Sequence, residues 1–328
     1  MVKRSIPAGM LFLFYDISDR GGEIMTEYKN YAVIDIGSNS LRLMKGLLDR
    51  SGQWQFSPKE LVTTRLGKDV GKTGRLWAPG REASLDVLER WAHQLSGIPV
   101  CAVATSAVRE AKDGQAFLAE IRCRFGWNCR TVSGREEGSL SFCGATAAVP
   151  PERLVTVLDI GGGSSEMTVG KNGAMLTTHS YPLGAVRLTE GVLTTAAEIA
   201  AVELRCNAAW LPLPVKTQYL IGVGGTLTTL AAMDLGLACY DPKRIEGYSV
   251  SLERLNFQIS RLTAMAPEER KHVAGLQPER SEIIVTGLII ARSFMKYYGF
   301  TVLSVSEKDL LEGVFYKEAF YDAARMVF

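Results

Sequence analysis

Short apolar runs alternate with amphipathic stretches along most of the chain. The run at 31–36 is apolar except for one Asp, as in a buried strand, and 41–48 predicts a second strand after a tight turn. Between Glu82 and Leu95, apolar residues recur at helical spacing with charges between them. The same reasoning predicts strands at 99–104, 129–132, 154–160, 166–169, 219–223 and 301–305, and helices at 115–125, 136–148, 197–210, 226–235, 252–265, 281–298 and about 308–324. This mixture predicts an α/β protein.

The strand and turn that open this pattern occur twice. A buried strand ends in Asp35-Ile-Gly-Ser-Asn-Ser40, and about one domain length later another ends in Asp159-Ile-Gly-Gly-Gly-Ser164. A second strand follows each copy. Such a long period indicates two similar lobes instead of a solenoid. We therefore expect lobe I at 25–149 and lobe II at 150–307, with a cleft between them.

The first residues stand apart from this pattern. Met25 lies shortly before the first predicted strand, so we interpret residues 1–24 as an upstream extension or a misassigned start. The apolar stretch at 10–15 is too short for a signal-peptide core and lacks a small-residue cleavage site. No run approaches the length of a transmembrane helix, so we expect no membrane partner.

Composition narrows the class of protein further. The chain has 328 residues, 47% of them hydrophobic, and 37 Lys and Arg against 35 Asp and Glu. This balance gives no bulk electrostatic argument for nucleic-acid binding, so any polyanion must bind at a local basic patch. The six cysteines and three histidines are too scattered for a zinc site. Reduced core cysteines are typical of a cytoplasmic protein, which is the localisation we expect.

Both Asp-Ile-Gly turns contain the parts of a phosphate-binding loop. Glycines let backbone N–H groups approach an anion, and hydroxyls add donors. We expect phosphate contacts at Gly37, Ser38, Asn39, Ser40, Gly161, Gly162, Gly163 and Ser164. A third turn, Gly222-Val-Gly-Gly-Thr226, adds Gly224, Gly225 and Thr226 as candidates. One such turn alone is equally typical of a β-hairpin with Asp as a cap, but its recurrence favours a phosphate site.

The acids beside these turns predict a metal ion. A carboxylate does not usefully contact a phosphate unless a cation lies between them. Asp35 and Asp159 each end a buried strand next to a turn, so they predict Mg²⁺ or Mn²⁺ with water in its shell. Glu166, on the strand that leaves the second turn, is a third candidate ligand.

Two arginines are candidate phosphate ligands, because a guanidinium group matches a pair of phosphate oxygens. Arg42 comes just after the first turn, although strand alternation could equally point it to solvent. Arg280 is the second candidate, and Arg187 is a further one. A single surface arginine is more often solvated than functional.

Six motifs in fixed order resemble one known family. They cover most of the chain, from about Tyr31 to Tyr316, and comprise Asp35-Ile-Gly-Ser-Asn-Ser40, Ala104-Thr-Ser-Ala-Val-Arg-Glu-Ala111, Ser133-Gly-Arg-Glu-Glu137, Asp159-Ile-Gly-Gly-Gly-Ser-Ser-Glu166, Leu183-Gly-Ala-Val-Arg-Leu188 and Gly222-Val-Gly-Gly-Thr226. Together they resemble the exopolyphosphatase / guanosine pentaphosphate phosphohydrolase (Ppx/GppA) family in its short two-domain form. The resemblance implies two actin-like (ribonuclease H-like) lobes of the sugar kinase, heat-shock chaperone and actin superfamily. It also implies that the last helix returns to pack on lobe I.

The resemblance implies a reaction as well. Members split the terminal phosphoanhydride of inorganic polyphosphate or guanosine pentaphosphate with a divalent cation. Glu137 matches the proposed catalytic base of the family, and Arg109 matches an arginine that faces phosphate. The neighbouring Glu136 is the weaker candidate for the base. A pair of acids is also what a helix N-terminus favours through its dipole, and the two interpretations are compatible.

Two other functions fit the same fold. One is a phosphotransferase, for which no acceptor motif is recognisable. The other is a nucleotide or alarmone sensor that binds guanosine tetraphosphate without turnover, against which the retained Glu137 counts. Glu246 stands where many relatives have His, which puts the substrate preference in doubt. Members often form homodimers, and the sequence shows no self-complementary patch that would decide this point.

Overall fold

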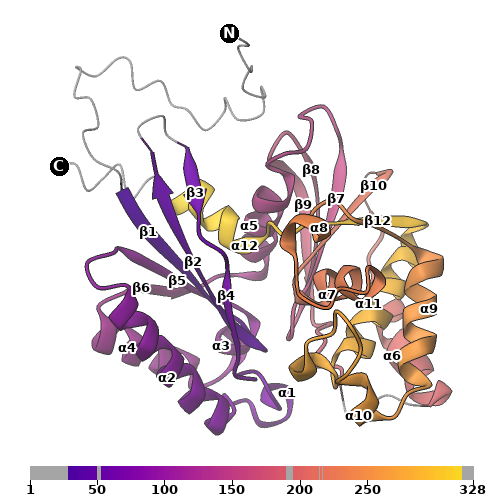
Figure 1. Ribbon diagram of the computed structural model, residues 1–328, viewed down its shortest axis with the longest axis horizontal. Coiled ribbons are helices and arrows are strands. Elements are labelled where there is room, and N and C mark those ends of the chain that lie inside the picture. Colours follow the sequence, from indigo (N-terminus) through magenta and orange to yellow (C-terminus); the bar gives the residue numbers. More distant parts are fainter. Residues whose placement is uncertain (1–28, 50–52, 190–194, 214, 216, 320–328) are drawn as a thin grey trace.

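The computed structural model describes residues 29–49, 53–189, 195–213, 215 and 217–319. They form two α/β lobes that lie side by side, each built on a six-stranded mixed sheet (Figure 1). The predicted α/β class with two lobes is confirmed. The extension at 1–24 and the end of the predicted last helix lie outside the described residues.

Lobe I is built on a sheet in which the strand that carries Asp35 is central. The strands are β1 (Lys29–Ile36), β2 (Ser40–Leu48), β3 (Trp54–Phe56), β4 (Glu60–Thr63), β5 (Val100–Ala104) and β6 (Asn128–Thr131). Their order is β3-β2-β1-β5-β6, and β4 pairs with β2. Strand β2 runs antiparallel to β1, whereas β5 and β6 continue the sheet in parallel. This arrangement places the β1–β2 turn and the carboxyl ends of β5 and β6 at one edge.

Lobe II repeats this topology. Its strands are β7 (Val155–Ile160), β8 (Ser165–Lys171), β9 (Ala174–Tyr181), β10 (Tyr219–Val223), β11 (Ser249–Ser251) and β12 (Val302–Val305). In the order β11-β12-β10-β7-β8-β9, strands β7, β8 and β9 form an antiparallel meander, and β10 and β12 run parallel to β7. The second Asp-Ile-Gly turn therefore occupies the same place in its lobe as the first.

Helices cover the sheets and supply a large part of the apolar core. In lobe I they are α1 (Val70–Thr73), α2 (Ala78–Gln94), α3 (Ser106–Glu110) and α4 (Gly114–Phe125). In lobe II they are α6 (Ala196–Ala209), α7 (Gly225–Asp234), α8 (Pro242–Ile245), α9 (Leu252–Thr263), α10 (Pro267–Arg270), the 3-10 turn Pro278–Arg280 and α11 (Ile284–Tyr298). The apolar faces of α2 and α4 pack on the lobe I sheet, and α11 is the centre of the lobe II core. No helix in the described part of the chain is long and apolar enough to cross a membrane.

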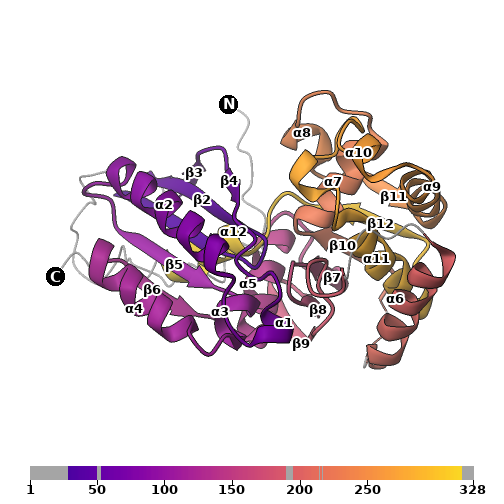
Figure 2. The same ribbon diagram turned by 90° about the horizontal axis from the view of Figure 1, so that it is seen from below.

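Two helices lie between the sheets (Figure 2). Helix α5 (Gly134–Thr146) packs on the lobe I core through Leu140 and on the lobe II sheet through Phe142. Helix α12 (Leu310–Val314), which continues as the π-helical turn Phe315–Ala319, packs on α5 and β1. A Cβ atom on Gly313 would lie 2.0 Å from the Leu140 carbonyl oxygen, so only glycine permits this crossing. Because α5 contacts both sheets, the lobe boundary at 149–150 stays a prediction.

Candidate phosphate site between the lobes

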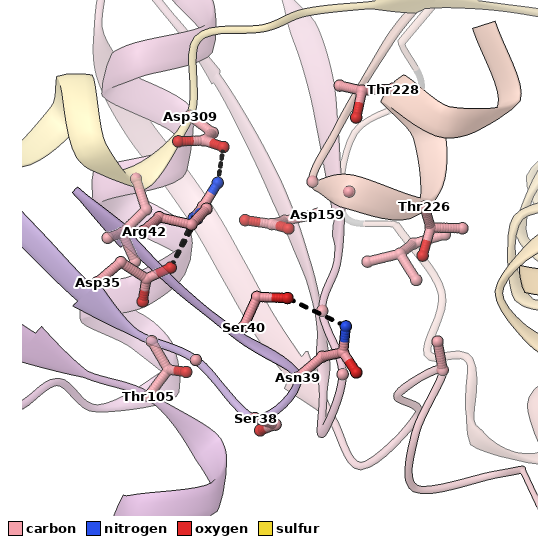
Figure 3. Close-up of a pocket in the computed structure, with 18 of the residues that line it drawn as sticks. Asp35, Ser38, Asn39, Ser40, Arg42, Thr105, Asp159, Thr226, Thr228 and Asp309 are labelled. Atoms are coloured by element: carbon pink, nitrogen blue, oxygen red, sulfur yellow. Dashed lines mark hydrogen bonds and ion pairs between the residues drawn. The ribbon is translucent and has the colours of Figure 1, made fainter. Parts of the chain in front are cut away.

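A cavity of ≈ 260 Å³ lies between the two lobes (Figure 3). Most of the predicted site residues line it, and they comprise Asp35, Gly37, Ser38, Asn39, Ser40, Arg42, Glu137, Asp159, Gly161, Gly162, Gly163, Ser164, Gly224, Gly225, Thr226 and Arg280. Two predicted residues, Arg109 and Glu166, lie behind the wall. The structure therefore brings together turns that are far apart in the sequence.

The two Asp-Ile-Gly turns have the same backbone geometry. The Gly37 N–H donates to the Ser40 carbonyl at 3.1 Å, and the Gly161 N–H donates to the Ser164 carbonyl at 3.0 Å. Each acid also has a cross-strand partner at the same register: Asp35 is opposite Arg42, and Asp159 is opposite Glu166. The repeat seen in the sequence is thus a repeat of local structure. Arg42 occupies the cross-strand position in the first lobe that Glu166 occupies in the second.

The turns from the two lobes contact each other. A Cβ atom on Gly162 would lie 3.1 Å from the Ser38 Cβ, and one on Gly163 would lie 2.4 Å from the Ser106 Oγ. Gly224, whose φ is +86°, approaches so closely that its Cβ would lie 2.7 Å from Asp159 Oδ1. Side chains at these glycines would separate the three turns. The glycines therefore permit the lobes to close around one small cavity.

Glu137 faces the cavity from the first turn of α5. Its side chain is buried, and its Oε2 accepts a hydrogen bond from Arg109 Nη1 at 2.8 Å. Burial raises the pKa of Glu137 to about 7; Arg109 opposes this rise, and the charges of Asp159 and Asp35 add to it. Glu136 instead forms an ion pair with Arg130 at 2.7 Å and does not line the cavity.

The two acids of lobe II differ in exposure to the cavity. Asp159 Oδ2 accepts a hydrogen bond from Ser141 Oγ at 2.6 Å, and burial raises the pKa of Asp159 to about 6. Glu166 is only 2% exposed, and its Oε1 accepts from Ser180 Oγ at 2.6 Å. Burial, followed by the charges of Glu137 and Asp159, raises the pKa of Glu166 well above its usual range. Glu166 therefore lies one layer behind the acid that it was predicted to assist.

Arg42 joins the first phosphate turn to the C-terminal part of the chain. Its Nε and Nη2 lie 2.8 Å from Asp35 Oδ2, and its Nη1 donates to Asp309 (Figure 3). Lys59 pairs with Asp309 at 3.3 Å and with Glu312 at 3.0 Å. Burial alone would raise the pKa of Asp309, but Arg42 and Lys59 outweigh it and lower the pKa to about 2. Arg42 thus points into the cavity, already paired with two acids.

Lys59 and Asp309 are cavity residues that the sequence analysis did not name. Asp309 comes four residues after the half-buried strand β12 and caps α12 by accepting from the Leu311 N–H at 3.1 Å. An acid between a strand and a helix is the signal that could have identified it. Nothing in the sequence around Lys59 indicates its role.

Arg280 is the cavity arginine that has no acidic partner among the described residues. Its Nε donates to Gln277 Oε1 at 2.9 Å, and the rest of its guanidinium group lies beside Gly225. Burial, with a smaller effect from the charge of Arg42, lowers the pKa of Arg280 to about 10. A buried cation that lacks a counterion is a binding position for an anion.

Glu246 does not place its charge in the cavity. It is exposed, and its Oε2 accepts from the Glu307 N–H at 2.7 Å and from Ser306 Oγ at 3.3 Å. The Glu246 side chain therefore fixes the segment at Ser306 and Glu307, which precedes Asp309.

The donor set fits a divalent cation that is bound mainly by water and substrate. Within the described ranges, no group of three or more Asp, Glu, His or Cys residues is arranged to hold a metal ion. Mg²⁺, however, commonly uses one or two carboxylates, with water and phosphate oxygens completing its shell. Asp159 and Asp35 line the same cavity, and Asp35 Oδ1 is a buried oxygen without a hydrogen-bond partner in the described structure.

Two repeated α/β lobes that close on facing glycine turns define an actin-like protein with a central cleft. The model of the Ppx/GppA phosphatase family matches residues 49–321, and the chain belongs to this family. It is 30% identical over 309 residues to Exopolyphosphatase 2 of Mycobacterium tuberculosis, which covers 86% of this chain and 96% of that protein. The resemblance inferred from the six motifs is therefore confirmed.

Solved structures agree with this assignment. The crystal structure of the Aquifex aeolicus family member is 27% identical, with a TM-score of 0.75, and the match covers 90% of this chain and 99% of that one. An exopolyphosphatase from Cytophaga hutchinsonii is 25% identical, with a TM-score of 0.82, and the match covers 90% of this chain and 98% of that one. Both matches therefore extend over nearly the full length of the solved chain.

Proposed function

We propose that this protein hydrolyses the terminal phosphoanhydride of inorganic polyphosphate or guanosine pentaphosphate. The observation that carries the proposal is the position of Glu137. Its carboxylate lines the same cavity as both Asp-Ile-Gly turns, and the pKa of about 7 is that of a group able to accept a proton near neutral pH. The relatives named exopolyphosphatase support the choice of substrate class.

The glycine turns bind the terminal phosphate in this proposal. Backbone N–H groups and hydroxyls of the two facing turns surround its oxygens, as preorganised donors do in phosphoryl-transfer sites. Arg280 binds the phosphate chain from the lobe II side, because its guanidinium group faces the cavity without an acidic partner in the described structure. Arg42 is already neutralised by Asp35 and Asp309, so it positions the first turn more than it binds substrate.

Glu137 positions the attacking water and accepts its proton. Water must approach the phosphorus in line with the leaving oxygen, which requires a fixed acceptor on one side of the phosphate. Arg109 fixes the Glu137 carboxylate from behind, since Nη1 of the same arginine also donates to the Val132 carbonyl at 2.8 Å. Arg109 therefore acts through Glu137, although it was predicted to face the phosphate.

Asp159 and Asp35 would hold the divalent cation. When bound, Mg²⁺ or Mn²⁺ would offset the negative charge on the phosphoryl oxygens. Glu166 lies one layer behind, and we assign it the role of supporting Asp159 and Glu137 electrostatically.

The test is phosphate release from polyphosphate and from guanosine pentaphosphate, with and without Mg²⁺. We expect metal-dependent release by the wild type, a loss of about 10³-fold or more in Glu137→Gln, and little change in Glu136→Gln. The ratio of the two wild-type rates identifies the preferred substrate. Folded wild-type protein that releases no phosphate from either compound would refute the proposal. Transfer to ADP would then indicate a phosphotransferase, and guanosine tetraphosphate binding without turnover would indicate a sensor.

A further inference from the structure

Arg187 of lobe II reaches across the cleft and contacts lobe I. It belongs to the turn that follows β9, and its Nε donates to the Gly163 carbonyl at 2.5 Å. Its Nη2 donates to Glu110, at 2.7 Å from Oε1 and 2.6 Å from Oε2, and lies 3.3 Å from Ser106 Oγ. One guanidinium group thus joins the second phosphate turn to helix α3 of the other lobe.

On the lobe I side, hydrogen bonds connect Glu110 to residues that line the cavity. Ser106 Oγ donates to Glu110 Oε1 at 2.7 Å, and Ser106 lines the cavity. The Ala107 N–H, in the same short helix, donates to Ser38 Oγ in the first phosphate turn at 3.2 Å. Burial would raise the pKa of Glu110, but the hydrogen bonds from Arg187 and Ser106 outweigh it and lower the pKa. The chain of contacts therefore runs from one phosphate turn to the other.

Neither charged residue lines the cavity itself. Arg187 lines a smaller cavity of ≈ 50 Å³ that shares Ser38, Ser106 and Gly163 with the first, and it is not part of the lining of the cavity between the lobes. A second ion pair between the lobes, Arg65 with Glu282 at 3.1 Å, has no such side-chain connections in the described structure. Its side chains are 35% and 50% exposed, and neither has a described side-chain hydrogen bond to a phosphate turn; Arg65 contacts the first turn only through its backbone N–H, which donates to the Asn39 carbonyl at 2.9 Å and which a side-chain substitution leaves in place. It provides a matched control.

We propose that Arg187 and Glu110 are positioning residues that clasp the two phosphate turns together, so that substrate binds only in the clasped state. The inference rests on the proposed function and adds a coupling between the lobes to it. Breaking the clasp lowers the fraction of molecules competent to bind, which raises the apparent KM in proportion. Saturating substrate restores the closed state, because ligand binding favours the state that it binds. The clasp therefore affects KM more than kcat.

The test compares Arg187→Gln, Glu110→Gln and the double variant with the control Arg65→Gln. We expect each single clasp variant to raise KM for phosphate release about 10-fold, with kcat within about 3-fold of wild type. The double variant should be no worse than Arg187→Gln, since that substitution already breaks the contact with Glu110. The Arg65→Gln control should change KM less than about 2-fold. An unchanged KM, equal losses in the control, or additive effects in the double variant would overturn the clasp.

A second measurement keeps the clasp testable independently of catalysis. The rise in melting temperature caused by tripolyphosphate reports binding without requiring turnover. We expect this rise to be smaller in Arg187→Gln than in wild type and unchanged in Arg65→Gln, with melting temperatures without ligand showing that each variant folds. An equal rise in wild type and Arg187→Gln contradicts the clasp. If wild type releases no phosphate but Arg187→Gln still shows the smaller rise, the proposed reaction fails and the clasp stands.

Discussion

The Arg109 guanidinium group holds the Glu137 carboxylate at 2.8 Å, and the two residues belong to different motifs of lobe I. Arg109 is in the short helix α3, whereas Glu137 is in α5, which lies between the lobes. Two opposing effects determine the pKa of Glu137 in this pair. Burial raises the pKa of Glu137, and the adjacent positive charge limits the rise to about 7. A base with a lower pKa would accept a proton less readily, and one with a higher pKa would already be protonated at neutral pH.

Replacing Arg109 should shift the pH dependence of the reaction. In Arg109→Gln the opposing charge is lost, so the pKa of Glu137 rises further, and the base is deprotonated only at higher pH. We expect the rising limb of kcat/KM to move upward by about one pH unit, equivalent to ~1.4 kcal/mol. Arg109→Lys, which keeps a positive charge, should shift it less. A pH profile of Arg109→Gln that coincides with that of wild type would show that Arg109 does not tune this base.

Glu137 should destabilise the folded protein above neutral pH. Its pKa is about 7 in the folded state, above its ordinary value of 4.5, so the folded state binds the proton more tightly. The stabilisation from this proton is fully present below pH 4.5 and is lost as the pH rises through 7. Glu137→Gln lacks this loss, and we expect it to be more stable than wild type at pH 8 by about 1–3 kcal/mol, with the difference vanishing near pH 4.5.

Urea unfolding of Glu137→Gln and wild type at several pH values measures this difference. Glu136→Gln is the control, because Glu136 is paired at the surface with Arg130 and does not line the cavity. Its stability should follow that of wild type at every pH. If Glu137→Gln were no more stable than wild type at pH 8, Glu137 would not be held in the folded state with a raised pKa.

The repeated strands and turns were predictable because local sequence determines them. Strands β1 and β7 are buried apolar runs, and each ends in an Asp-Ile-Gly turn. In both turns the first glycine lies against the carbonyl oxygen of the serine three residues later. Strands β3, β4, β9 and β11 were not predicted. The first two and β9 are largely half-exposed or exposed, and β11 is only three residues long, so hydrophobic periodicity is weak there. Their pairing in the sheets stabilises them instead.

The cavity was predictable only as far as it consists of these turns. Asp309 lies 267 residues after its partner Arg42, and only the packing of α12 on α5 brings it there. Glu166 was predicted from its distance along the strand after Asp159, but the fold places it behind the wall. Sequence shows which residues end strands, whereas the packing of the lobes decides which side chains reach the substrate.

Arg280 should contribute to substrate affinity. Arg280→Gln removes the cavity guanidinium group that has no acidic partner in the described structure, so a phosphate oxygen loses a charged hydrogen bond worth about 1.5–3 kcal/mol. We expect kcat/KM for polyphosphate to fall about 10- to 100-fold, mainly through KM. Arg244→Gln, at an exposed position, is the control and should change kcat/KM little. Similar kinetics for wild type and Arg280→Gln would exclude a direct contact with phosphate.

Gly313 should link stability to the geometry of the cavity. In Gly313→Ala the added methyl group would lie 2.0 Å from the Leu140 carbonyl oxygen, so α12 must move away from α5. Because Asp309 caps α12 and pairs with Arg42, this movement also disturbs the first phosphate turn. We expect the variant to lose about 2–4 kcal/mol of stability in urea unfolding, and to lose phosphate release even where it remains folded. Gly71→Ala has its nearest neighbour at 3.7 Å and should match wild type in stability. A Gly313→Ala variant with wild-type stability would mean that α12 and α5 do not cross as closely as this structure indicates.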